Sequence, residues 1–174
     1  MNPNWKDEVV GVILRAMLGT VMGIAIAYAW IPNAEAGEWA TYGVEGVYGS
    51  SYELQRGTVL SVIFDDPTCE TVHLTVIGGG MSDTLTITTL DGYSEDADVT
   101  NELTPDGVEF GHTHLTTDSL LGMVEAYPMF DVTFAGHTYE QRGVNTVVAL
   151  EEAYQECMKV GRLGLFSSGQ VVRF

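Results

Sequence analysis

The sequence predicts a mainly β, α+β fold: an antiparallel sheet or small sandwich with one short helix and one C-terminal amphipathic helix packed on it, preceded by an N-terminal hydrophobic helix. Three observations carry this prediction. Several segments alternate apolar and polar residues and are bounded by Gly, Pro, Asp or Asn. Two later segments repeat apolar residues every three or four positions, and an uncharged run from Ala16 to Ile31 precedes an acidic, turn-rich remainder. We therefore expect a leader over residues 1–36 and one domain over residues 37–174.

The leader has the pattern of an export signal. Lys6 and Arg15 precede the uncharged run, and the small residues Ala34 and Ala36 stand where signal peptidase requires them, which places cleavage between Ala36 and Gly37. Because the cations lie on the amino-terminal side, the remainder of the chain is expected outside the cytoplasm, in the periplasm or secreted.

Retention of the same segment as an anchor in the cytoplasmic membrane is the alternative. Val9 to Ile31 is long enough to span a bilayer if Arg15 extends to the interface. Gly19, Gly23 and Ala27 would then form a small-residue face for packing against other membrane helices. In that case the membrane is contacted only through the N-terminal segment, and residues 37–174 lie outside.

The two cysteines, Cys69 and Cys157, both follow the expected cleavage point. In an oxidising compartment an even pair predicts one disulfide bond. Two buried thiols are the alternative, and a redox pair is disfavoured because the chain has no Cys-x-x-Cys spacing. The bond would fasten the late helix to the sheet.

Three strands are the most regular: 59–64, 72–77 and 84–90. In the first two, one face carries the alternate apolar residues and the other is expected to be wet, as in the third, where threonines face away from Leu85 and Ile87. The glycines 78–80 and the pair Asp91-Gly92 predict turns. Further strands are expected at 40–48, 108–114, 129–135 and 163–174.

Two segments predict helices. The first covers 117–127, with Thr117 or Asp118 as its cap and Pro128 as its stop. The second covers 146–160, capped by Asn145 and ended by Gly161, with Cys157 on its apolar face.

The aromatic residues Trp39, Tyr42, Tyr48 and Tyr52 cluster after the leader. On an exposed strand they would form an adhesive surface for a protein or carbohydrate. We expect them instead in the core or at a strand edge, because aromatic residues are common in strands.

Composition restricts the partners. The chain has 24 Asp and Glu against 7 Lys and Arg, a formal net charge of −17. Its few cations are scattered, which disfavours nucleic acid. A strongly acidic surface favours a basic protein partner or bound cations, or serves solubility alone. The oligomeric state is left open.

Metal chemistry has two candidates. His112 and His114 are two residues apart, so on a strand their rings share one side and can chelate zinc or copper with further ligands. His73 and His137 are available as such ligands. The alternative is that these histidines are ordinary strand or turn residues. Asp91, Glu95, Asp96 and Asp98 are expected in a loop that offers calcium its preferred oxygen ligands, with solvated turn residues as the alternative. Neither pattern requires a cofactor.

No catalytic motif points to an enzyme. The chain has no G-x-S-x-G, S-x-x-K or H-E-x-x-H, and the glycines at 78–80 lie between strands rather than before a helix. We therefore predict a non-catalytic envelope protein that acts by protein contact, binding or inhibiting a basic partner through its acidic surface. The alternatives are a single-pass accessory subunit of a larger complex and a metal-dependent enzyme.

Overall fold

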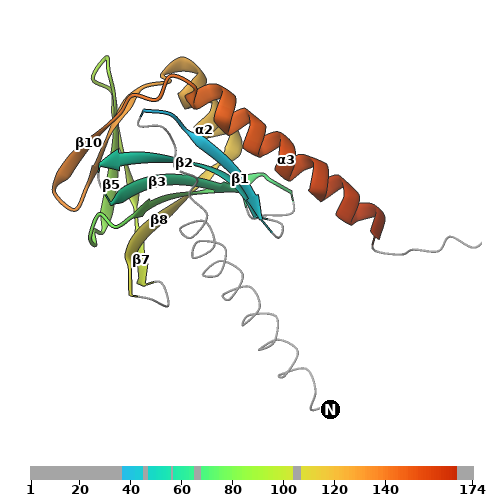
Figure 1. Ribbon diagram of the computed structural model, residues 1–174. Helices are drawn as coiled ribbons and strands as arrows, with labels where there is room; N and C mark the ends of the chain where they lie inside the picture. Colours follow the sequence, from blue (N-terminus) through green and yellow to red (C-terminus); the bar gives the residue numbers. More distant parts are fainter. Residues whose placement is uncertain (1–36, 45–46, 56, 65–67, 104–106, 168–174) are drawn as a thin grey trace, which may run out of the picture.

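The computed structural model describes residues 37–44, 47–55, 57–64, 68–103 and 107–167, and these form two antiparallel sheets and two helices (Figure 1). In chain order the elements are β1 (Ala40–Val44), β2 (Val47–Gln55), β3 (Thr58–Phe64), β4 (Thr71–Ile77), β5 (Thr84–Thr89), β6 (Ser94–Asp98), β7 (Thr100–Leu103), β8 (Glu109–Thr116), α2 (Thr117–Ala126), β9 (Phe130–Phe134), β10 (His137–Gln141) and α3 (Thr146–Ser167). The predicted β-rich α+β class is confirmed.

The two sheets share one main core. The six-stranded sheet has the order β1-β2-β3-β4-β8-β7, and the four-stranded sheet has the order β10-β9-β5-β6. Alternate residues of β3 and β4, among them Leu60 and Leu74, meet Leu85 and Phe134 of the smaller sheet in this core. The apolar alternation predicted these inward faces correctly.

The opposite face of the six-stranded sheet is also buried, which corrects the expectation that β3 and β4 are wet on one side. All seven residues of β3 are buried, as are six of the seven in β4. A second apolar cluster on this face contains Ile63, Ile77 and Phe110. The Tyr42 hydroxyl lies 2.7 Å from the Ser61 hydroxyl on the same face. Burial raises the pKa of Tyr42 well above its ordinary value, and the hydrogen bond to Ser61 opposes this in part.

The four-stranded sheet keeps one polar face, as expected for β5. Leu85 and Ile87 are buried, whereas Thr86 and Thr88 on the other face are partly exposed. The acidic segment that follows is not a loop, however, because residues 94–98 form β6 and pair with β5. Thr86 donates a hydrogen bond to Asp96 across this pair, so the segment is fixed as an edge strand.

Helix α2 begins at Thr117, within the predicted range, but its capping residue lies one position earlier than the predicted Thr117 or Asp118. Its N-cap is Thr116, whose hydroxyl accepts a hydrogen bond from the Ser119 amide at 3.3 Å. Thr117 is buried, and its hydroxyl donates to the Cys69 carbonyl instead. The expected end before Pro128 agrees with the observed last residue, Ala126.

Helix α3 begins at Thr146, as predicted, but the capping role of the Asn145 side chain and the end of the helix differ from the prediction. The Asn145 side chain does not cap it: its Oδ1 accepts from the Trp39 amide at 2.8 Å and its Nδ2 donates to the Trp39 carbonyl at 3.0 Å. The helix also runs through Gly161 to Ser167, so a strand starting at residue 163 was wrong over 163–167; the rest of that strand lies outside the described residues. A glycine inside a helix costs only about 1 kcal/mol, which the surrounding helix formers tolerate.

The predicted bond between Cys69 and Cys157 is confirmed, with both residues buried. It fastens α3 to the residues just before β4, on the apolar face where Ala153 and Leu150 also enter the core. Trp39 and Tyr52 are buried and Tyr48 packs against the core, which agrees with the core interpretation of the early aromatics.

Among the described helices, none combines the length and hydropathy that crossing a bilayer requires. The expected leader, including Gly19, Gly23, Ala27 and Ala36, lies outside the described residues, which begin at Gly37.

Candidate metal centre

Two neighbouring strands bring three histidines together. His112 and His114 alternate along β8 and therefore share one face of the six-stranded sheet. The β4–β8 register places His73 directly opposite His114, and Thr75 directly opposite His112. Side chains that face each other across an antiparallel pair are close enough to act on one ligand. The register thus builds a compact cluster from residues about forty positions apart in the chain.

The spacing of the three rings suits a common ligand. One nitrogen from each of His73, His112 and His114 lies within 4.8 Å of the others. The His73 and His114 ring centroids are 4.1 Å apart, and the His112 centroid lies 5.7 Å from that of His73 and 5.4 Å from that of His114.

Two of the three histidines are buried to a degree that is unusual for polar side chains. His73 and His112 retain only 7% and 5% of their surface, whereas His114 is exposed. Both ring nitrogens of His112 are buried with no hydrogen-bond partner among the described residues, and so is the hydroxyl of Thr75 opposite it. Leaving a buried polar atom unsatisfied costs about 1–3 kcal/mol, so groups of this kind call for a specific explanation.

Glu102 adds a carboxylate to the cluster. Its Oε1 lies 3.5 Å from His112 Nε2, which is too long for a good hydrogen bond but close enough to share an ion. It comes from β7, the strand that pairs with β8, and its side chain is 35% exposed.

The donor set fits a zinc-class ion. Three imidazole nitrogens with a carboxylate oxygen suit zinc, copper or nickel, whereas calcium prefers oxygen ligands alone. Zinc–nitrogen bonds of about 2.0–2.1 Å separate tetrahedral ligands by about 3.3 Å. Separations of up to 4.8 Å therefore need a closure of about 1.5 Å, which rotation of side chains supplies.

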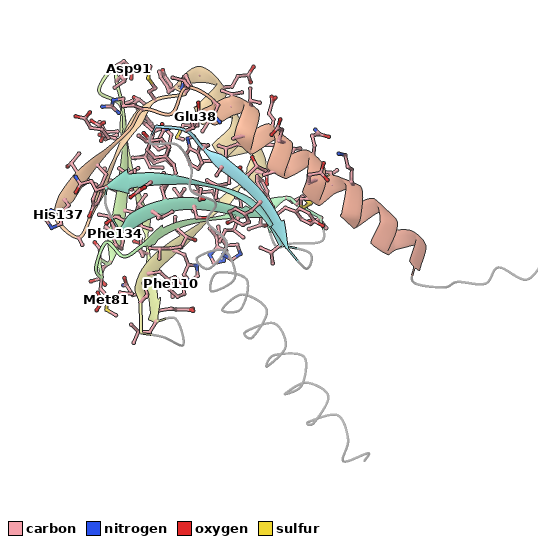
Figure 2. All side chains as sticks on the ribbon, in the orientation of Figure 1. Glu38, Met81, Asp91, Phe110, Phe134 and His137 are labelled. Atoms are coloured by element: carbon pink, nitrogen blue, oxygen red, sulfur yellow. A yellow bond between two sulfur atoms is a disulfide. The ribbon has the colours of Figure 1, made fainter. Side chains whose placement is uncertain are left out.

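The cluster extends the sequence-based prediction. His112 and His114 were predicted as ligands, and His73 was only one of two further histidines available. The other, His137, is exposed on β10 of the smaller sheet, and Figure 2 shows it away from Phe110 on β8. Glu102 was missed; the signal that would have found it is the pairing of β7 with β8.

The residues considered for calcium are spread along one hairpin. Asp91 lies in the turn after β5, and Glu95 and Asp96 are neighbours on β6, where successive side chains point to opposite faces. Asp96 is engaged by Thr86 and Asp91 by Thr89. The four carboxylates therefore do not share one face of the strand.

Fold and site define a disulfide-bonded domain of two antiparallel sheets with a histidine cluster on the larger one. No protein-family model matches the chain, and the comparisons with curated proteins and with solved structures also found no match.

Proposed function

We propose that this protein is an exported metal-binding protein that holds one zinc-class divalent ion through His73, His112 and His114. The observation that carries the proposal is the buried, unsatisfied imidazole of His112 within 4.8 Å of nitrogens on two other histidines. A bound ion would use one of its nitrogens and offset part of the cost of burying the ring.

The charge of the chain supports a cation as the ligand. A net charge of −17 raises the local concentration of cations around the protein. The exposed position of His114 gives an ion a route to the two buried rings from that side. Copper and nickel share the same ligand preferences, so the ion is proposed as a class.

Binding rather than catalysis is the proposed role. Zinc enzymes keep one coordination position open for water or substrate, whereas closed sites use four protein ligands. With Glu102 beside His112, the cluster offers three nitrogens and one oxygen, enough to fill four positions.

Export is the second part of the proposal. The buried disulfide between Cys69 and Cys157 supports an oxidising compartment, because cytosolic thiols are kept reduced. We propose that residues 1–36 direct the chain outside the cytoplasm, either as a cleaved signal or as an anchor. N-terminal sequencing of the native protein decides between a start at Gly37 and a retained leader.

Zinc content tests the proposed function. The protein is dialysed against buffered zinc, and bound metal is counted by mass spectrometry for the unaltered chain, His114→Asn and His137→Asn. We expect about one zinc per chain, retained in His137→Asn and lost in His114→Asn. Because the His114 side chain is exposed, its replacement should leave the fold intact. Equal zinc content in both variants, or none in the unaltered protein, would overturn the proposal.

A further inference from the structure

Exposed apolar side chains are concentrated at one end of the molecule. Eight large hydrophobic residues are exposed in the part of the chain that the structure describes. Six of them belong to three connections and the first turn of α3, and we call this set the apolar end: Leu90, Tyr93, Tyr127, Met129, Val144 and Val148. The other two, Met81 and Leu103, lie elsewhere.

Sheet register brings the three connections together. Thr89 pairs with Phe130, which in turn pairs with Gln141, so the residues beyond these positions leave the smaller sheet at the same end. Contacts link them further: Tyr127 is hydrogen-bonded to Asp91, and Arg142 Nη1 donates to the Phe130 carbonyl at 2.9 Å. Figure 2 shows Asp91 at this end and Met81 at the opposite one.

The side chains of the apolar end keep large fractions of their surface exposed to water. Val144 keeps 85% of its surface in water, Tyr93 61% and Leu90 59%. Single exposed hydrophobic residues are ordinary, but a group of six at one end is typical of an interaction site. Tyrosine and methionine are also enriched at protein interfaces.

Negative charge surrounds the apolar end. Asp91 lies in the same turn as Leu90, Glu125 lies near Tyr127 on α2, and Glu151 and Glu152 are one helical turn beyond Val148. The hydrogen bond from the Thr89 hydroxyl lowers the pKa of Asp91; desolvation opposes this, and weaker hydrogen bonds from the Tyr93 amide and the Tyr127 side chain add to the lowering. An aspartate is already ionised at neutral pH at its ordinary pKa, so Asp91 carries a negative charge there.

The nearby cation does not cancel this charge. The guanidinium of Arg142 is already paired with Asp131 and lies 3.7 Å from Glu140. An approaching partner therefore meets apolar side chains within an acidic border. The complementary surface is one that carries apolar residues among lysines or arginines.

We propose that the apolar end is a docking site for a basic, amphipathic segment of a partner protein. Apolar side chains of the segment would cover Leu90, Tyr93 and Met129, and its cations would face Asp91 and Glu125. This inference does not depend on the metal site, which lies on β4 and β8 of the other sheet.

Two synthetic peptides test the proposal. One alternates lysine with leucine, and the other has serine in place of each leucine. Binding of fluorescent forms is measured by anisotropy in low salt. Two double variants are compared with the unaltered protein: Leu90→Ser with Tyr93→Ser at the apolar end, and Met81→Ser with Leu103→Ser as matched controls of similar exposure.

We expect the lysine–leucine peptide to bind the unaltered protein and the control variant alike, and at least about tenfold more weakly to the apolar-end variant. The lysine–serine peptide should bind weakly to all three. Equal binding of both peptides, equal losses in both variants, or no binding to the unaltered protein would overturn the proposal. Self-association in sedimentation runs that only the apolar-end variant abolishes would also overturn it, because the occupant would then be a second copy of this chain.

Discussion

Loss of the Cys69–Cys157 bond should remove a large part of the stability of this domain. The bond joins residues 88 positions apart and therefore restricts most of the described chain in the unfolded state. In the chain-entropy description, a loop of this length corresponds to about 4–5 kcal/mol. That is comparable to the whole net stability of many domains, about 5–15 kcal/mol.

Urea unfolding measures the effect. Three samples are compared: the oxidised protein, the same protein reduced with its sulfur atoms intact, and Cys69→Ala with Cys157→Ala. With a urea dependence of about 1–3 kcal/mol per M, the midpoint should fall by about 1.5 M or more on reduction. Because both sulfurs are buried, the alanine variant should fall slightly further through lost packing.

The reduced protein separates two causes of destabilisation: loss of the covalent bond and loss of the packing of the sulfur atoms. If its midpoint coincides with that of the oxidised protein while the alanine variant is destabilised, packing of the sulfurs, and not the covalent bond, stabilises the attachment of α3. That result would refute the entropic argument and would also weaken the case for an oxidising compartment.

Two further predictions concern the larger sheet. Burial raises the pKa of Tyr42 above its unfolded value, so the contribution of this side chain to stability is complete below pH about 10 and is lost as the pH rises through the folded-state pKa. Tyr42→Phe should therefore flatten the loss of stability above pH about 10 in alkaline unfolding curves. An unchanged slope would contradict this prediction. Gly111→Ala should destabilise the domain by about 1–3 kcal/mol in urea unfolding, since its methyl group would lie 2.5 Å from Phe134 of the opposite sheet; a stable variant would show that the two sheets separate easily.

The parts of the fold that sequence predicted best are governed by local periodicity. The inward faces of β3, β4 and β5 follow from alternation, and the apolar face of α3 correctly placed Cys157 toward the sheet. The early strand was predicted as one segment over 40–48, whereas the chain forms β1 and β2, which pair from Val44 and Val47. β10 was not predicted, because its residues are mostly polar and exposed.

The errors arise where tertiary contacts override local preference. Asn145 is a good helix cap by residue type, but pairing with the Trp39 backbone uses its side chain. The burial of Ile63 and Ile77 on the outer face of the larger sheet does not follow from alternation, which marks only one apolar face in each strand.

The candidate site shows the same division. Spacing alone placed His112 and His114 on one face of a strand, because side chains alternate with a period of two. Whether His73 or His137 joins them depends on strand register, which a single sequence does not specify. Glu102 depends on the position of β7 at the edge of the sheet.

X-ray absorption at the zinc edge tests the central claim, that His73, His112 and His114 form a metal centre, most directly. The zinc-loaded protein should show three nitrogen ligands with the scattering pattern of imidazole at about 2.0–2.1 Å, together with one oxygen. A shell made only of oxygens would place the ion on surface carboxylates and contradict the account.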